Sequence, residues 1–297
     1  MKYSLLCLLK LFSVFGCIAS ISACTENQLY QPYDLTGEQL FSENIEGPVW
    51  KDSCWYVVNF RRDGTVGTVN ISGRAAVFVE LPAGSNANSI LFNSAGEMLL
   101  ADWPMNQILK VAPGTKVVSV FIQDTLFHQP NDFTINRQGQ IFASDPDWKN
   151  GSGRIWRIEP DGSRVILKEG MGTTNGITLS PSEDILYVNE SLQRQILELQ
   201  VDENGNLKQD RVFAAFDDFG LDGMKCDRDG NLYVTRHGKG TVVVFNPSGK
   251  VIREITLKGK KPSNLAFGGK DGKTCIVTLQ DRGSIEAFRT EIPGAGF

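Results

Sequence analysis

The chain has 297 residues, 41% of them apolar and 22% charged, which is the balance of an ordinary globular protein with enough apolar residues for a sizeable core. Its formal net charge is −4, with 30 basic and 34 acidic residues dispersed along the chain, which argues against nucleic acid as the main partner. Only two histidines occur, His128 and His237, so a zinc site built from several histidines is excluded.

Residues 1–23 are typical of a secretory signal, with an early lysine, an apolar run from Leu5 to Val14 and small residues up to Ala23. The sequence Ile21-Ser22-Ala23-Cys24 resembles a bacterial lipoprotein signal, in which the cysteine is lipidated. The alternative is an ordinary cleaved signal with an incidental cysteine. On the first interpretation, Cys24 carries a lipid anchor, residues 24–37 are a tether, and the protein is exported to the periplasm or cell surface.

From about residue 38 onward, one pattern is repeated along the chain. A residue with a side-chain oxygen opens a short apolar strand, a turn follows about eight residues later, and a second apolar strand comes next. In the clearest copy, Asp222 leads through the turn at Gly230 to the strand Leu232-Tyr233-Val234. The six openers are Glu46, Asn88, Asn131, Asn175, Asp222 and Asn264.

Successive openers are separated by 42, 43, 44, 47 and 42 residues. A period in the low to mid forties, filled by about four short strands, is typical of a β-propeller blade. We therefore expect an all-β, six-bladed β-propeller over residues 38–297. The last repeat has only three strands, so we expect a strand at residues 38–42 to complete the last blade and close the ring.

The openers are expected to form a ring at one mouth of the central channel, because the first strand of each blade lies innermost. Two carboxylates with several amides suit a hard divalent cation, Ca²⁺ first, with Mg²⁺, Mn²⁺ or Zn²⁺ as alternatives. We expect Glu46, Asn131, Asn175 and Asp222 to be the metal ligands. The alternative is that asparagine and aspartate cap strands and turns there, which does not account for Glu46, since glutamate is not a turn former.

The ends of the second strands should form an outer ring around the same mouth. The candidate substrate-binding residues in the two rings and the adjoining loops are Asn88, His128, Asp132, Asp145 and His237. Each histidine could orient substrate or move a proton, or be a plain surface residue. Trp148 could wall a substrate pocket or pack between blades. Cys54 and Cys275 fall in neighbouring blades, where a disulfide is conceivable, although buried apolar cysteines are the favoured interpretation.

Five motifs in order resemble the SMP-30/gluconolactonase family, also called regucalcin-like, over roughly residues 40–292. These motifs are Ile45-Glu46-Gly47-Pro48-Val49-Trp50, Gln129-Pro130-Asn131-Asp132, Thr174-Asn175-Gly176-Ile177, Leu221-Asp222-Gly223-Met224, and Pro262-Ser263-Asn264-Leu265-Ala266-Phe267-Gly268-Gly269. The resemblance implies a six-bladed, calcium-type propeller that hydrolyses sugar lactones or related cyclic esters.

The resemblance also assigns roles to individual residues. Glu46, Asn175 and Asp222 match the family's metal ligands, and Asn131 matches an asparagine that contacts substrate or metal. Asp222 is further implied as the general base, and Asp132 as a residue that supports the ligands. The loop at residues 125–129 departs from the pattern, because it lacks the basic residue that often holds substrate hydroxyls, and this leaves the identity of the lactone open.

The expected function is therefore metal-dependent hydrolysis of a lactone, with Asp222 and Asn131 as catalytic residues. The expected partner is a small-molecule lactone or ester, the membrane is contacted only through the lipid anchor, and the protein is a monomer. Two alternatives stay open. One is a lipid-anchored propeller that binds a protein or glycan and keeps a structural metal, and the other is a metal-dependent esterase of different specificity.

Overall fold

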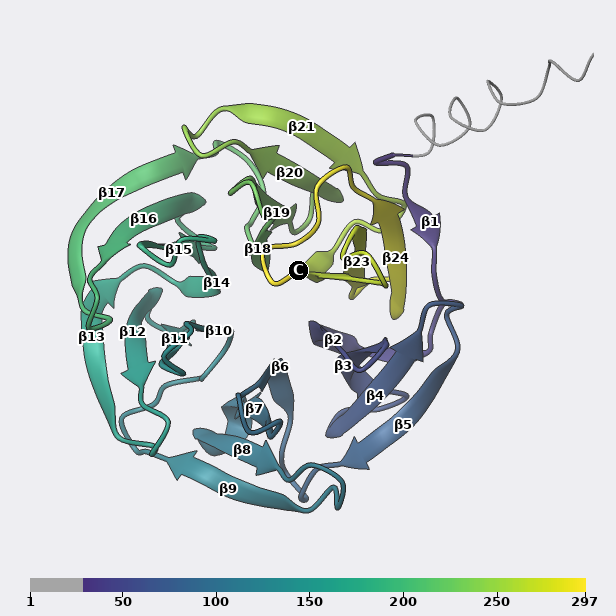
Figure 1. Ribbon diagram of the computed structural model, residues 1–297, viewed down its shortest axis with the longest axis horizontal. Coiled ribbons are helices and arrows are strands. Elements are labelled where there is room, and N and C mark those ends of the chain that lie inside the picture. Colours follow the sequence, from purple (N-terminus) through teal and green to yellow (C-terminus); the bar gives the residue numbers. More distant parts are fainter. Residues whose placement is uncertain (1–28) are drawn as a thin grey trace, which may run out of the picture.

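Short strands separated by tight turns form six antiparallel sheets of four strands each, arranged as a ring around a central channel (Figure 1). This computed structural model describes residues 29–297. The predicted signal sequence, the lipidation site Cys24 and the start of the tether lie outside the described residues. No helix among residues 29–297 has the length and apolar character needed to cross a membrane.

Each blade takes four strands from one sequence repeat, except the last. Blades one to three are β2 (Phe41–Lys51), β3 (Cys54–Phe60), β4 (Thr65–Asn70) and β5 (Ala75–Glu80); β6 (Ala87–Phe92), β7 (Met98–Asp102), β8 (Gln107–Val111) and β9 (Val118–Gln123); and β10 (Phe133–Ile135), β11 (Ile141–Asp147), β12 (Ser152–Ile158) and β13 (Arg164–Met171). A single 3-10 turn, η1 (Trp103–Met105), follows β7.

Blades four to six complete the ring. They are β14 (Thr174–Leu179), β15 (Ile185–Glu190), β16 (Gln195–Val201) and β17 (Leu207–Ala215); β18 (Met224–Cys226), β19 (Leu232–Arg236), β20 (Thr241–Phe245) and β21 (Val251–Thr256); and β22 (Pro262–Gly268), β23 (Thr274–Leu279), β24 (Ser284–Arg289) and β1 (Tyr33–Asp34). The predicted six-bladed propeller is confirmed.

The N-terminal strand closes the ring, as expected, but it is not the predicted segment 38–42. Tyr33 pairs with Ala287 and Asp34 with Glu286 on the outer edge of β24, whereas residues 41 and 42 belong to β2 in the first blade. Charge holds this short strand in place, because Arg282 forms ion pairs with Asp34 at 2.7 Å and with Glu286 at 2.6 Å. The propeller therefore begins within residues that the sequence assigned to the tether.

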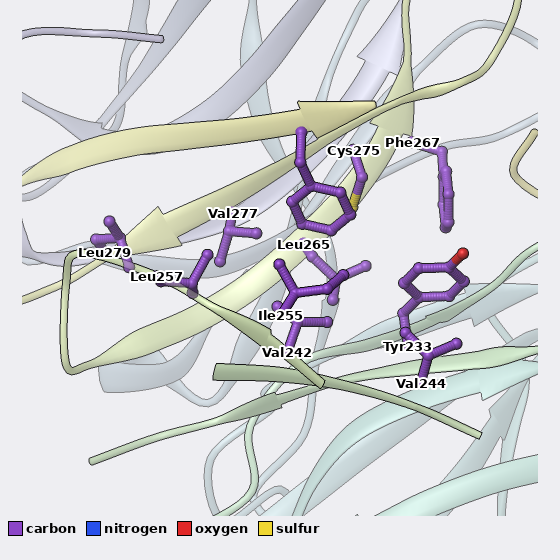
Figure 2. Packing of buried hydrophobic residues seen from close by; sticks show 11 residues of the cluster. Tyr233, Val242, Val244, Ile255, Leu257, Leu265, Phe267, Cys275, Val277 and Leu279 are labelled. Atoms are coloured by element: carbon purple, nitrogen blue, oxygen red, sulfur yellow. The ribbon is translucent and has the colours of Figure 1, made fainter. Parts of the chain in front are cut away.

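The hydrophobic core lies between the blades rather than in one central mass. Six clusters of buried apolar residues occur, and each joins two neighbouring blades. Figure 2 shows one of them, in which Val242 and Ile255 of the fifth blade pack against Leu265 and Val277 of the sixth. Each sheet buries its apolar side chains against the blades on either side of it. The central channel is therefore lined mainly by polar residues.

The three cysteines of the described domain are free. Cys226 and Cys275 are buried, and Cys54 is half-buried. The conceivable Cys54–Cys275 disulfide is therefore not formed, and the favoured interpretation of buried apolar cysteines holds for Cys275, which packs among the apolar residues of the cluster in Figure 2.

Candidate active site

A cavity of about 440 Å³ opens at one mouth of the channel. Five of the six openers line it, together with residues from the ends of second strands and the loops between blades. The lining residues are Glu46, Asn88, Gln129, Asn131, Trp148, Asn175, Ser191, Leu192, Gly220, Leu221, Asp222, His237 and Gln280. The structure thus brings together the four predicted metal ligands in one place.

Irregular first strands turn the openers toward the channel. The pairing of β2 with β3 shifts register on both sides of Glu46, and the pairing of β14 with β15 shifts between Thr174 and Ile177, around Asn175. Asn131 and Asp222 precede the short strands β10 and β18, so their conformation is not set by a sheet ladder. Bulges of this kind re-aim side chains next to functional sites.

A glycine follows three of the four predicted ligands and lets the innermost strands approach each other closely. A Cβ on Gly176 would lie 2.2 Å from the carbonyl oxygen of Asp222, and one on Gly223 would lie 2.0 Å from Oδ1 of Asn264. Gly47 would bring its Cβ to 2.6 Å from the backbone of Ser89, and its φ of +52° also favours glycine. The ring is therefore narrow only because these positions have no side chain.

The two carboxyl groups in the cavity disfavour each other's ionised form. Burial raises the pKa of Glu46, although the amide N–H of Gly47 donates to its Oε2 at 2.7 Å. Burial also raises the pKa of Asp222, and the nearby charge of Glu46 raises it further. Two adjacent carboxylates with few donors become stable as a pair when a cation or a shared proton lies between them.

The amides supply oxygen atoms that the protein itself does not use. Oδ1 of Asn131 is buried and has no hydrogen-bond partner within residues 29–297. Asn175 donates its Nδ2 to Oγ of Ser191 at 3.1 Å, which leaves its Oδ1 as an acceptor. Two carboxylates and two amide oxygens form a donor set that fits Ca²⁺ or another hard cation. Nowhere in residues 29–297 do three His, Cys, Asp or Glu side chains gather to hold a metal, so a cation in this cavity would depend on the amide oxygens as well as on the two carboxylates.

Asp222 is held by contacts that its sequence motif did not reveal. Its backbone N–H donates to Thr235 at 3.2 Å, its carbonyl accepts from Nδ2 of Asn189, and the carbonyl of Leu221 accepts from Oγ of Ser191. These bonds link the fourth and fifth blades at the site. Neither Asn189 nor Ser191 carries a sequence signal that distinguishes it from other polar residues at strand ends.

Arg236 also holds the loop that precedes Asp222. This buried arginine donates from Nη2 to the carbonyl and the Oδ1 of Asp218, both at 2.7 Å, and its guanidinium lies 3.6 Å from the ring centre of Phe216. The ion pair and the cation–π contact fix the direction in which the chain enters the cavity wall.

Comparison with known proteins agrees with the motifs. A family model described as SMP-30/Gluconolactonase/LRE-like region matches residues 45–281. The chain belongs to this family. The gluconolactonase of Zymomonas mobilis is 28% identical over 271 residues, which cover 78% of this chain and 75% of the relative.

Solved structures with the same fold include proteins described as a regucalcin and a gluconolactonase. A calcium-binding regucalcin from Agrobacterium tumefaciens matches with a TM-score of 0.76 at 20% identity, covering 90% of this chain and 94% of that one. A gluconolactonase from Xanthomonas campestris matches with a TM-score of 0.75 at 20% identity, covering 88% and 89%. At this level of identity the likeness shows the fold alone.

Three of the residues that the sequence predicts to bind substrate do not line the cavity. Asp145 is fully buried, and its carboxylate accepts hydrogen bonds from the backbone N–H groups of His128 and Gln129 and from the indole N–H of Trp156. It secures the loop that leads into the third blade. His128 itself faces away toward Arg154, whose Nη2 lies 2.9 Å from its Nε2.

The third residue, Asp132, lies deeper in the channel. It lines a small cavity of about 150 Å³ beyond the ring of predicted ligands, and its Oδ1 accepts from Oγ of Ser89 at 2.8 Å. By contrast, Asn88 and His237 do line the candidate active site. His237 shares a hydrogen bond of 3.1 Å with Oε1 of Gln280, and burial lowers its pKa, so this imidazole is neutral at pH 7.

Proposed function

We propose that this protein is a lactonase, a hydrolase that opens a sugar lactone or a related cyclic ester with the help of a divalent cation. Its family membership supports this proposal, as do the relatives named for gluconolactone hydrolysis. The observation that carries it is that the carboxyl groups of Glu46 and Asp222 line one cavity with Asn131, whose buried Oδ1 has no hydrogen-bond partner within residues 29–297.

The cation, Ca²⁺ by preference, would be held by Glu46, Asn131, Asn175 and Asp222. When bound, such a cation polarises an ester carbonyl and makes a nearby water more acidic. Support for calcium comes from the structural relative described as a calcium-binding protein. Hard oxygen donors, two of them charged, favour the same choice.

Two side chains of the cavity would carry out the proton transfer and the charge stabilisation. Asp222 would accept the proton of the attacking water, because its carboxyl group lies in the cavity beside the residues that would hold the cation. The Nδ2 of Asn131 would donate a hydrogen bond to the oxyanion that develops on the carbonyl oxygen. Trp148 and Leu192, exposed at 39% and 56%, would shape the entrance for the substrate.

The test is acid release from glucono-1,5-lactone by the purified protein. Turnover should vanish with a chelator and return with one of Ca²⁺, Mg²⁺, Mn²⁺ or Zn²⁺. Asp222→Asn should lower kcat by about 10²-fold or more, the usual range for a general base. The matched control Asp217→Asn removes an exposed carboxylate from the same loop and should leave kcat unchanged. Turnover that survives complete chelation would reject metal dependence.

A second outcome separates the expected alternatives. If the protein binds a cation but opens no lactone, assays with aryl esters test the esterase alternative. Failure on both substrate classes would favour the binding module. Variants of Asn88 and His237, which line the cavity, would then be tested for ligand binding rather than for turnover.

We also propose that the protein is exported, cleaved before Cys24 and held at a membrane by acyl chains on that cysteine. Two or more acyl chains are needed for stable anchoring. Metabolic labelling with a fatty acid should mark the wild type, and Cys24→Ala should be unlabelled and released into the soluble fraction. Labelling of the Cys24→Ala variant would place the lipid elsewhere. We expect the released domain to be a monomer by size exclusion.

A further inference from the structure

The channel contains a third carboxylate, Asp132, just beyond the proposed metal ligands. Its side chain is 3% exposed. Oδ1 accepts from Oγ of Ser89 at 2.8 Å and from the N–H of Phe133 at 2.9 Å. Burying a carboxylate costs free energy unless hydrogen bonds and a nearby positive charge compensate for the lost solvent.

Lys225 supplies a positive charge at this point. Its Nζ lies 3.6 Å from Oδ2 of Asp132, the one ion pair that residues 29–297 offer to this lysine. Lys225 is on β18, three residues after Asp222, so one short segment provides both a proposed ligand and a cation. The ammonium side chain is 27% exposed.

Lys225 approaches the site from the side opposite the candidate active site. It lines the small cavity that contains Asp132, and also a cavity of about 550 Å³ between the far ends of the innermost strands. It does not line the cavity that contains the proposed ligands. The lysine therefore acts on the metal site through its charge and through Asp132, without occupying a coordination position.

The sum of the charges around the proposed metal site indicates what Lys225 contributes. Glu46, Asp132 and Asp222 together contribute −3, and Lys225 reduces the total to −2, which a divalent cation neutralises. The small cavity that Lys225 and Asp132 line also reaches Gly47, whose amide N–H donates to Oε2 of Glu46, so both charges lie close to the proposed ligands. A buried cluster that retains net charge would be costly, so the balance selects for the charge of the bound ion.

We propose that Lys225 is a positioning residue that sets the net charge of the metal site and thereby its preference for divalent over trivalent cations. This inference rests on the proposed function, because it requires that the site binds a metal. It adds that the cation preference is set by a residue outside the coordination sphere.

The experiment is calorimetric titration of the purified protein with Ca²⁺ and with Tb³⁺, an ion of similar size and higher charge. Coulomb energy is linear in the charge of the ion, so Lys225→Met should raise Ca²⁺ affinity about tenfold and Tb³⁺ affinity about thirtyfold. The ratio of the two affinities should rise about threefold. Asp132→Asn should shift the ratio in the opposite direction, and the double variant should return it close to the wild-type value.

Two controls isolate the charge. Lys225→Arg keeps it, and Lys250→Met removes a lysine from an exposed turn of the same blade, so neither should move the ratio. If Lys225→Met weakens both ions equally or leaves both unchanged, the lysine has only a structural role and the proposal fails. If the variant does not fold, Asp132→Asn carries the same test. A wild type that binds neither ion would instead refute the proposed metal site itself.

Discussion

Gly176 provides a direct test of how the narrow ring of ligands is built. A Cβ at this position would lie 2.2 Å from the carbonyl oxygen of Asp222, 2.8 Å from Nδ2 of Asn189 and 3.0 Å from the Cα of Gly223. The first and third of these atoms belong to the backbone. The amide of Asn189 is hydrogen-bonded to the Asp222 carbonyl, so none of the three can move without the others. Gly176→Ala must therefore displace the segment that carries Asp222.

The cost should fall at the upper end of the range for overpacking, about 3 kcal/mol. For a domain of this size that corresponds to a decrease of about 6–12 °C in Tm. Cation affinity should fall as well, by about tenfold or more, because ligand geometry within about half an ångström is needed for tight binding. Thermal denaturation and calorimetric titration measure the two effects separately.

Gly220→Ala is the matched control. Gly220 lines the same cavity and precedes Asp222 by two residues, but the nearest atom to its Cβ would be 3.8 Å away, an ordinary contact. This variant should keep wild-type stability to within about 0.5 kcal/mol. Wild-type Tm and cation affinity in Gly176→Ala would refute the argument that the missing Cβ sets the width of the ring.

Three further predictions follow from the contacts outside the ring. Asp145→Ala should cost about 2–4 kcal/mol in the free energy of unfolding, measured by urea denaturation, because it leaves the buried indole N–H of Trp156 and two partly buried backbone N–H groups unpaired; a smaller loss would indicate that water replaces the carboxylate. Deletion of residues 29–36 should lower Tm and cause association that increases with concentration in light scattering, because it removes β1 (Tyr33–Asp34) and exposes the edge of β24; a monomer of unchanged Tm would contradict this. The hydrogen bond from Arg289 lowers the pKa of Asp271 to about 2, so its stabilising effect is full above the unfolded pKa near ~3.9 and is lost as the pH falls toward 2. Because the pair is partly exposed, Asp271→Asn should lower stability by no more than about 1 kcal/mol at pH 7 and the difference should disappear near pH 2; a constant difference would exclude this pair as its cause.

The repeat made the fold and the position of the site predictable from sequence. The similar spacing of Glu46, Asn88 and the later openers, 42 to 47 residues, indicates equivalent places in equivalent blades, and a closed ring brings equivalent places together. The first-strand glycines were visible as motif letters, but the reason for them, contact with the neighbouring blade, required coordinates.

Other features could not be read from the sequence. Asp145 lies two residues before the end of β11 and His237 directly follows β19. The carboxylate of Asp145 nevertheless binds the preceding loop, whereas the imidazole of His237 lines the cavity. A polar residue at a strand end is compatible with either direction. The closing strand was also misplaced, because Tyr33–Asp34 is too short to show any periodicity, and its pairing depends on the distant charge of Arg282.

The pairing of β1 with β24 has a consequence for the order in which the protein can be completed during its synthesis. Asp34 lies opposite Glu286, which is 252 residues further along the chain and must be made before this pair can form. At about 5–20 residues per second, the first strand waits for about 13–50 s with no partner. During that interval the last blade does not exist, while the five earlier blades can form one after another. Ring closure is therefore the final step. The closing strand is only two residues long, follows Pro32 and carries a charge at Asp34, and these features keep it from pairing with other chains until then.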